Sequence, residues 1–367
     1  MNNRVHLSSV MRDNSDELRL VAFEVTRRCA FNCRYCRASA GYSVGQQELA
    51  TGQCKRILKS VADFTVARER HRSGEKRPRP VIILTGGEPM EREDIYELGS
   101  YGSKLGMRMV MATCGYFIND ESIARIREAG VSALSFSLDG ASAETNDEFK
   151  QTSGAFDAII TAAEIAARSE MPFQINTTIT KLNVDEIFGI AELAKKLGAN
   201  CFNAFALVPT GRAEQMWDQI LDPIEYEALL NELLRLKLES GIEVRVTCAP
   251  AFARLVRQEK LDQLTKGVSG CMAGKGFGFI SYRGDVQTCG FLDIVAGNLL
   301  ENDFDFGKIW TESPFLNEIR DPCNYTGNCG TCDYVGVCGG CRARAFALSG
   351  DHLAADPVCG YRPRADR

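Results

Sequence analysis

The sequence has no long hydrophobic run: no apolar stretch approaches the roughly 20 residues that a membrane-spanning helix needs. Its first segment, from Met1 to Glu17, is polar and lacks the hydrophobic region of a secretory signal peptide. A charge excess is also missing, because the net charge of the 367 residues is only −5, and so nothing draws the whole chain to nucleic acid or to an anionic membrane. We therefore expect a cytoplasmic protein with no membrane span and no nucleic-acid partner.

Histidine is scarce, with three in the chain, whereas cysteine is abundant, with fifteen. Cytosolic thiols stay reduced, so metal or cluster binding explains this number better than disulfide bonds do. Eight of the fifteen lie in about the last hundred residues, and three more form one motif near the start. Of the four that remain, we interpret Cys54, Cys114 and Cys201 as small buried apolar residues. The fourth is Cys248.

The motif near the start follows a short apolar run, Leu20 to Val25, and has the spacing C-x3-C-x2-C. Its cysteines are Cys29, Cys33 and Cys36. A cubane iron–sulfur cluster has four irons, each of which normally takes one thiolate from the protein, so three cysteines leave one iron open. An open metal position is typical of a catalytic site. A zinc knuckle is the alternative, but zinc signatures supply four ligands, and no fourth cysteine or histidine lies nearby.

Short β-rich runs alternate with amphipathic stretches in the first two thirds of the chain. This alternation predicts right-handed βαβ units and a parallel sheet in an α/β fold. Strands are expected at Leu20–Thr26, Val81–Thr85, Arg108–Thr113, Ala133–Leu138, Phe173–Thr180 and Cys201–Val208. A mainly helical pattern follows to about residue 268, with a short strand near Val244–Thr247. Functional residues are expected at the C-terminal ends of the strands.

Several motifs fall at these predicted strand ends. After Val81–Thr85, paired glycines allow close backbone approach, and Glu88 offers a carboxylate to a cationic group. Ser137 and Asp139 point to the same side at the end of the fourth strand, with a simple Asx turn as the alternative. Asn176 lies on the fifth strand. These positions predict a ligand site at one edge of the sheet.

A second cysteine-rich region occupies about the last hundred residues. Alternating runs at Phe277–Ser281 and Val286–Cys289 flank a turn at Gly284, which predicts a β-hairpin. The later cysteines run from Cys329 in the pattern C-x2-C-x5-C-x2-C and end at Cys359. The number of cysteines in this region indicates metal or cluster binding rather than disulfide bonds, and a structural zinc in the later run is the alternative to a cluster.

The C-x3-C-x-aromatic-C motif after a first strand resembles the signature of the radical S-adenosylmethionine (SAM) enzymes, with Tyr35 at the aromatic position that packs near the adenine. The resemblance implies a partial (β/α)6 TIM-like barrel in which Cys29, Cys33 and Cys36 hold a catalytic [4Fe–4S] cluster whose open iron chelates SAM. It also implies cofactor-binding roles for the motifs at the strand ends: Gly86, Gly87, Glu88, Pro89, Ser137, Asp139 and Asn176.

The last region resembles the SPASM extension of many radical SAM enzymes, which implies one or two auxiliary [4Fe–4S] clusters. Four cysteines would hold one cluster: Cys329, Cys332, Cys338 and Cys359. Three more would belong to a second: Cys271, Cys289 and Cys341. The fourth ligand of the second cluster is Cys248, Cys323 or none. The implied organisation is an N-terminal arm (1–19), the barrel (20–212), a helical bridge (213–268) and the cysteine-rich region (269–367).

Within the family, the chain is most similar to members that act in haem biosynthesis, over Glu24–Cys29, Tyr35–Ala40, Ile175–Thr180, Val208–Arg212 and Cys338–Ala345. The resemblance implies oxidative decarboxylation of iron-coproporphyrin III propionates to vinyl groups. It also implies an external electron donor such as ferredoxin or flavodoxin. Maturation of a ribosomal peptide and the modification of another tetrapyrrole are the alternatives.

Three arginines are candidates for recognition of a substrate carboxylate: Arg212, Arg342 and Arg344. A surface salt bridge is the alternative for the first, and charge on a helix surface is the alternative for the other two. Ala251 and Tyr282 stand where relatives carry histidine, so we expect no axial ligation of a porphyrin iron from those positions. The absence of histidine at positions 251 and 282 keeps maturation of a peptide open as the alternative to a porphyrin substrate.

Overall fold

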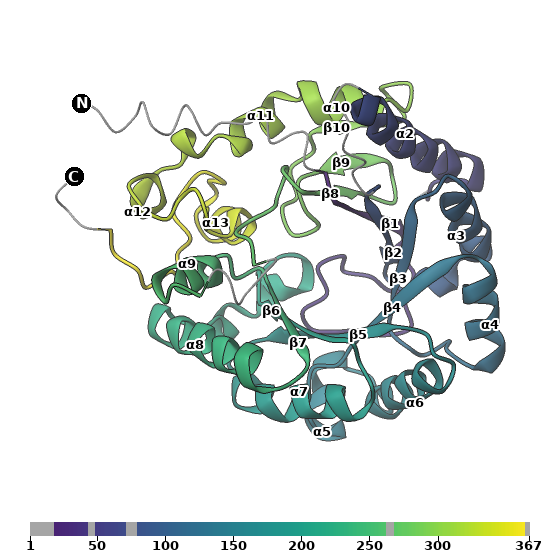
Figure 1. Cartoon of the computed structure of the whole chain (residues 1–367), viewed down its shortest axis with the longest axis horizontal. Coiled ribbons are helices and arrows are strands. Elements are labelled where there is room, and N and C mark those ends of the chain that lie inside the picture. Colours follow the sequence, from purple (N-terminus) through teal and green to yellow (C-terminus); the bar gives the residue numbers. More distant parts are fainter. Residues whose placement is uncertain (1–17, 43–47, 71–78, 262–267, 364–367) are drawn as a thin grey trace.

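A parallel sheet curves through the centre of the computed structural model, which describes residues 18–42, 48–70, 79–261 and 268–363 (Figure 1). The predicted N-terminal arm, 1–19, lies outside these residues except for Leu18 and Arg19. Seven strands follow one another in chain order, each parallel to the next: β1 (Leu20–Thr26), β2 (Val81–Gly86), β3 (Arg108–Thr113), β4 (Val131–Ser137), β5 (Phe173–Ile179), β6 (Cys201–Ala206) and β7 (Glu243–Thr247). The C-terminal ends of these strands therefore share one edge.

Helices cover the outer, convex face of this sheet (Figure 1). They are α2 (Thr51–Arg70), α3 (Ile95–Lys104), α4 (Asp120–Glu128), α5 (Ala143–Lys150), α6 (Ala155–Arg168), α7 (Ile187–Lys196) and α8 (Pro223–Glu239). Helix α6 buries Ile159, Ala162 and Ala166, a spacing of three and four residues that marks one face of a helix. None of the helices in the described ranges is both long and apolar enough to cross a membrane.

Short 3-10 helices lie in the connections of the barrel and of the cysteine-rich region. They are η2 (Pro89–Glu91), η3 (Val184–Glu186), η4 (Gly211–Gln215), η5 (Trp217–Gln219) and η6 (Pro322–Asn324). Two of them directly follow the strand ends that the sequence marks as functional, because η2 comes after β2 and η4 comes after β6.

Strand β5 shows how residues are sorted between the two faces of the sheet. Every second residue from Phe173 to Ile179 is buried, whereas Asn176 and Thr178, which lie between them, are half-buried. This period of two follows from the geometry of an extended strand. The apolar side packs into the core, and the other side lines a cavity, so the sheet places polar side chains where a ligand can reach them.

The sheet continues beyond the six strands that the sequence pattern predicts for the barrel. Strand β7 lies within the segment predicted as a helical bridge and pairs with β6. On the other edge, β8 (Phe277–Ile280) pairs in parallel with β1. The predicted hairpin is confirmed, since β8 pairs antiparallel with β9 (Asp285–Gln287), and β10 (Gly297–Asn298) extends it. Main-chain hydrogen bonds therefore join the cysteine-rich region to the barrel.

Short helices and turns form the rest of the cysteine-rich region, which extends from beside α2 to beside α8 (Figure 1). Helix α9 (Ala251–Gln258) precedes this region, and the helices within it are α10 (Phe306–Glu312), α11 (Pro314–Arg320), α12 (Gly327–Gly330) and α13 (Arg342–Ser349). Arg344 of α13 donates to the carbonyl oxygen of Cys248, just after β7, and to the hydroxyl of Tyr226 on α8. These contacts hold α13 against the last strand of the barrel.

Candidate active site and cluster sites

A cavity of about 230 Å³ opens at the C-terminal ends of the barrel strands. Its wall combines the three motif cysteines with residues at the ends of β2 to β6. The cavity wall contains eight of the residues that the sequence predicts for cluster and cofactor binding: Cys29, Cys33, Tyr35, Cys36, Gly86, Gly87, Ser137 and Asn176. Motifs that lie up to about 150 residues apart in the chain thus share one wall, as the parallel sheet predicts.

The turn after β6 holds the loop that carries the three cysteines. Arg212 donates from Nε to the carbonyl oxygen of Cys33 at 2.8 Å, and its backbone N–H donates to the carbonyl oxygen of Cys36 at 3.0 Å. Gly211 has a φ of 61°, and a Cβ there would lie 2.3 Å from the carbonyl oxygen of Arg37. The Arg212 guanidinium binds the protein's own backbone, so we assign it a structural role in place of the predicted recognition of a substrate carboxylate.

The three thiols of this loop fit the ligand set of an iron–sulfur cluster. Backbone N–H groups of Phe31 and Ala40 donate to the sulfurs of Cys29 and Cys36, each at 3.4 Å. Burial raises the pKa of the Cys29 thiol to about 12. A thiolate in this apolar wall therefore requires a positive partner, and bound metal supplies one.

Glu88 lies behind the cavity wall and orders the end of β3. It is fully buried, and it accepts hydrogen bonds from the Thr113 hydroxyl at 2.9 Å and from the backbone N–H of Cys114 at 2.6 Å. Burial raises its pKa, although these hydrogen bonds act in the opposite direction. Pro89 is also buried, at the start of η2. Cys114, which the sequence suggested was a plain apolar residue, lines the cavity itself.

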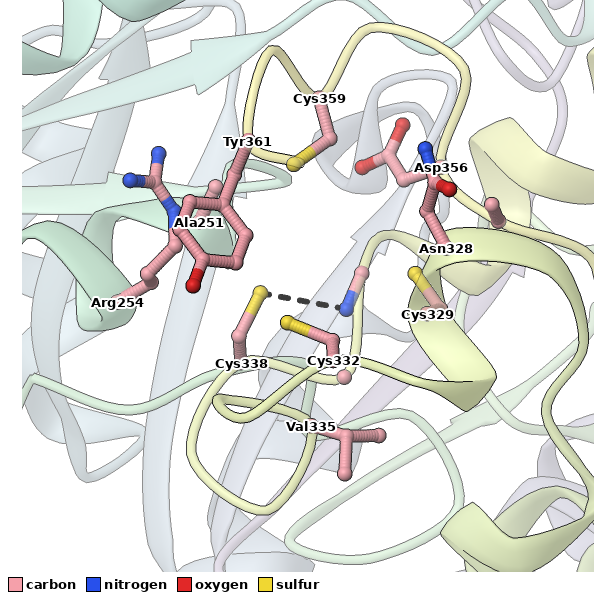
Figure 2. Close-up of a pocket in the computed structure, with 13 residues that line it drawn as sticks. Ala251, Arg254, Asn328, Cys329, Cys332, Val335, Cys338, Asp356, Cys359 and Tyr361 are labelled. Atoms are coloured by element: carbon pink, nitrogen blue, oxygen red, sulfur yellow. Dashed lines mark hydrogen bonds between the residues drawn. The ribbon is translucent and has the colours of Figure 1, made fainter. Parts of the chain in front are cut away.

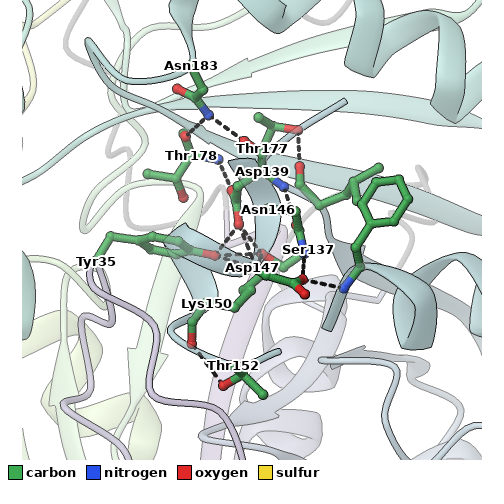
Figure 3. Close-up of polar contacts among 12 residues, drawn as sticks. Tyr35, Ser137, Asp139, Asn146, Asp147, Lys150, Thr152, Thr177, Thr178 and Asn183 are labelled. Atoms are coloured by element: carbon green, nitrogen blue, oxygen red, sulfur yellow. Dashed lines mark hydrogen bonds and ion pairs between the residues drawn. The ribbon is translucent and has the colours of Figure 1, made fainter. Parts of the chain in front are cut away.

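A buried polar network supports the wall on the side of β4 and β5 (Figure 3). The Lys150 ammonium donates to the Asp139 carboxylate at 2.6 Å, to the Tyr35 hydroxyl at 2.6 Å and to the Ser137 hydroxyl at 2.8 Å. The second oxygen of Asp139 accepts the backbone N–H of Thr178 at 2.7 Å. Asp139 therefore positions the groups that face the cavity, rather than facing it itself.

Lys150 is a site residue that the sequence reasoning missed. It ends α5, lines the cavity and is only 1% exposed. Burial alone would lower its pKa, but the neighbouring Asp139 and Tyr35 hold that pKa well above its usual value. The ammonium is therefore charged over the physiological range. No local pattern marks it, because its partners come from other parts of the chain.

Arg37, directly after the last motif cysteine, was missed as well. Its Nη1 donates to the buried carboxylate of Glu24 at 3.1 Å. The guanidinium lies over the ring of Phe279, with its carbon 4.5 Å from the ring centroid. It lines the same cavity as Lys150. Among the described residues of that wall, these two carry a positive charge.

The first predicted auxiliary site forms a small pocket of its own (Figure 2). The four cysteines predicted to share one cluster all line it: Cys329, Cys332, Cys338 and Cys359. The backbone N–H of Gly340 donates to the Cys338 sulfur at 3.4 Å, and Arg342 donates to the Cys329 sulfur at 3.5 Å. Burial raises the pKa of the Cys359 thiol to about 11. Four converging sulfurs with N–H donors fit a four-thiolate cluster.

The other auxiliary cysteines gather beside the end of β7. Cys289 and Cys341 share an apolar cluster with Cys248. A hydrogen bond between the Cys248 and Cys341 thiols lowers the pKa of Cys341 to about 7, whereas burial raises that of Cys289 to about 12. Across the described residues, no three cysteine, histidine or acidic side chains are grouped as the ligands of a single metal ion are.

Arg342 and Arg344 lie inside the cysteine-rich region rather than on a helix surface or in the cavity wall. Both are at most 1% exposed. Arg344 forms a two-pronged ion pair with Asp356, at 2.9 and 2.7 Å, and Arg342 donates to the carbonyl oxygen of Ala354 at 2.7 Å. Because the protein itself satisfies these guanidinium groups, we assign them structural roles in place of the predicted binding of substrate carboxylates.

Comparison with known proteins connects this geometry to a family. Residues 23–194 match the model of the radical SAM superfamily. A protein of Methanosarcina barkeri described as "AdoMet-dependent heme synthase" is 40% identical over 355 residues, which cover 94% of this chain and 97% of that protein. A protein of Oleidesulfovibrio alaskensis with the same description is 38% identical over 98% of this chain and 92% of its own. The mycofactocin maturase MftC of Mycobacterium tuberculosis (strain H37Rv) is 30% identical over 92% and 82%.

Solved structures share the fold across both regions. Streptococcus suis SuiB bound to the precursor peptide SuiA has a TM-score of 0.71 and 17% identity, covering 98% of this chain and 80% of SuiB. The structure described as native anSMEcpe with bound AdoMet has a TM-score of 0.67 and 16% identity, covering 93% and 94%. At these identities the likeness concerns the fold alone.

Proposed function

The chain belongs to the radical SAM superfamily, and on that premise we propose that it is a haem synthase that converts two propionates of iron-coproporphyrin III to vinyl groups. The observation that carries this proposal is the 40% identity to an AdoMet-dependent haem synthase over nearly the whole length of both chains. Each conversion removes a hydrogen atom, CO2 and one electron from a propionate. The 5′-deoxyadenosyl radical would take the hydrogen atom, and an auxiliary cluster of the cysteine-rich region would accept the electron. An external donor such as ferredoxin or flavodoxin would supply the electron that starts the reaction.

In this proposal the motif loop holds the catalytic cluster through Cys29, Cys33 and Cys36. When bound, the cluster and SAM supply a 5′-deoxyadenosyl radical, and the protein supplies orientation and exclusion of water. Arg212 and Gly211 fix the loop from behind by the backbone contacts described above. The site thus rests on a loop with little freedom to move, which favours a reaction that depends on the placement of the reacting atoms.

The network around Lys150 prepares the wall for the cofactor. Its three N–H groups are all engaged, by Asp139, Tyr35 and Ser137. Lys150 is therefore a positioning residue that fixes Tyr35 and Ser137 at the cavity wall. Ser137 and Asn176 line the cavity, and we assign them to the ribose hydroxyls or the carboxylate of SAM.

Arg37 is the group that we assign to a substrate carboxylate. A guanidinium has five N–H donors, and the described side-chain hydrogen bond of Arg37 takes one of its nitrogens, Nη1, to Glu24. The planar guanidinium of arginine can donate two parallel hydrogen bonds to a carboxylate, which the ammonium of a lysine cannot do. The remaining wall nearby is apolar, with Phe205, Val208 and Phe291, which suits the face of a macrocycle.

Maturation of a ribosomal peptide is the second candidate function. It is favoured by the 30% identity to the mycofactocin maturase MftC. The porphyrin substrate ranks first, because the identity to the haem synthases is higher and extends over more of both chains.

Product analysis distinguishes these candidates. Reconstituted protein is incubated without oxygen with dithionite, SAM and iron-coproporphyrin III, and we expect CO2, 5′-deoxyadenosine and haem. The Cys33→Ala protein serves as the control and should form none of the three. Cleavage of SAM without any porphyrin product would reject the haem synthase, and a mass loss on a precursor peptide would then support the maturase.

A further inference from the structure

Four cysteine side chains lie near one another where the barrel touches the cysteine-rich region. Three of them were predicted to share a cluster, namely Cys271, Cys289 and Cys341. The fourth is Cys248, which directly follows β7 and belongs to the barrel rather than to the cysteine-rich region. Its thiol is hydrogen-bonded to that of Cys341 and interacts electrostatically with Cys289. Cys271 in turn interacts with both Cys341 and Cys289.

We propose that Cys248 is the fourth protein ligand of the second auxiliary cluster, so that four thiolates close this cluster and no iron remains open to a substrate. The inference rests on the auxiliary clusters of the proposed function. A cubane takes one thiolate at each of its four irons, and the four cysteines here match that number. A ligand set that is complete in protein groups is typical of sites that do not bind substrate at the metal.

The backbone at Cys248 supports this assignment independently of the thiol contacts. Cys248 has a φ of 57°, in the left-handed region that residues with a side chain rarely adopt. Such conformations persist where the surroundings hold them, and they gather at functional sites. Here Arg344 donates to the Cys248 carbonyl oxygen at 3.0 Å and is fixed by its ion pair with Asp356. The chain therefore keeps a strained residue at the position that meets Cys341.

The other cysteines outside the two predicted ligand sets lie elsewhere in the fold. Cys323 is exposed in η6. Cys201 is buried at the first residue of β6, at the opposite end of the strand from the site. Cys54 is buried in α2, on the outer side of the barrel. Cys114 lines the SAM cavity. Among the described cysteines, Cys248 is the one that packs with Cys289 and Cys341.

The ligands of a cluster are spaced differently from those of a single metal ion. The ligands of a single ion all approach one atom, whereas the four thiolates of a cubane bind four different irons and so stand farther apart. Cys248 and Cys341 come from a barrel strand and from the start of α13. The cluster would therefore tie the two regions of the chain together.

The test uses the full chain, reconstituted without oxygen, with Cys29, Cys33 and Cys36 changed to alanine so that only the auxiliary clusters are observed. Into this background we introduce Cys248→Ala, with Cys271→Ala as the positive control and Cys323→Ala as the matched negative control. Iron content and the EPR spectrum after ferricyanide oxidation are measured. An iron without a thiolate is lost on oxidation, which leaves a [3Fe–4S] signal.

We expect the [3Fe–4S] signal, or a loss of about four irons per chain, in the Cys248→Ala and Cys271→Ala proteins and in neither the background protein nor Cys323→Ala. If Cys248→Ala does not fold, Cys248→Ser should keep the iron and shift the EPR signal of the reduced protein, because oxygen replaces one sulfur.

Three results would overturn the proposal. One is an unchanged iron content and spectrum in the Cys248 variants, another is a [3Fe–4S] signal from the background protein itself, and the third is a background protein with only about four irons. None of these measurements uses SAM cleavage or porphyrin. A negative result here therefore leaves the haem synthase proposal standing, and a failed haem assay leaves the ligand assignment testable.

Discussion

Lys150, a buried residue of the cavity wall, holds its neighbours Asp139, Tyr35 and Ser137 in place. Changing Lys150 to methionine would leave the Asp139 carboxylate buried without its cation, which costs about 3–5 kcal/mol in comparable pairs. We expect the free energy of unfolding, measured with urea, to fall by roughly that amount and the affinity for SAM to fall with it.

The matched control for this prediction is the double variant Asp139→Asn with Lys150→Met. It contains no uncompensated charge, so it should recover part of the lost stability. Equal stabilities of the single and double variants would show that the Asp139 charge is not what the lysine compensates.

Arg37 supports a prediction about the substrate alone. In Arg37→Lys the pairing with Glu24 can persist, but the planar fork for a carboxylate is lost. A charge-assisted hydrogen bond contributes about 1.5–3 kcal/mol, so we expect KM for the porphyrin to rise by at least about tenfold, while SAM binding is retained. Arg34→Gln is the control, because Arg34 lies on the same loop but pairs with Glu148 at the surface. An equal change of KM in both variants would contradict the assignment.

Among single residues, the sequence identified those that would bind the cluster or cofactor better than those that hold these residues in position. The cysteines and strand-end residues carry their own spacing, so their meeting at one cavity was predictable. Lys150 and Arg37 have no such signal, since their partners Asp139 and Glu24 are defined only by the fold. Conversely, charge alone suggested a substrate role for Arg344, which the structure buries against Asp356.

Among the elements, the turn after β6 matters most for the cluster loop. Gly211→Ala should strain the left-handed backbone by about 1–2 kcal/mol and also push the turn away from the Arg37 carbonyl. We expect less iron bound at the motif cysteines and a lower unfolding temperature. Gly154→Ala separates the two effects, because Gly154 also has a positive φ, 78°, but an added Cβ there meets no atom within 4 Å. If both variants lose stability and bound iron equally, contact between the added Cβ at position 211 and the Arg37 carbonyl does not determine how the cluster loop is held.

The elements themselves were largely predictable, whereas one strand pairing was not. The six predicted strands match β1 to β6 to within two residues at each end, because runs of apolar residues bounded by turns are a local signal. The parallel pairing of β8 with β1 joins residues about 250 positions apart. A local pattern cannot specify such a partner, since strand preference depends on neighbours that the fold supplies.

For the molecule as a whole, this pairing predicts that the barrel region does not behave well alone. A chain that ends after Val268 lacks β8 and leaves one edge of β1 unpaired, and an open apolar edge promotes association between chains. We expect aggregates in size-exclusion chromatography. A chain that ends after Leu292 keeps β8 and β9 and should yield more monomer. A monomeric, folded protein from the chain that ends after Val268 would show that β1 does not need β8 as a partner to avoid aggregation.

The same pairing has a consequence during synthesis. Translation adds about 5–20 residues per second, so a ribosome needs roughly 10–50 seconds to travel from the end of β1 to its late partner. During that interval one edge of β1 stays unpaired in the nascent chain, because β8 has not yet been synthesised. Cells that make this protein would thus depend on chaperones that act on the emerging chain, and slower translation would lengthen that dependence.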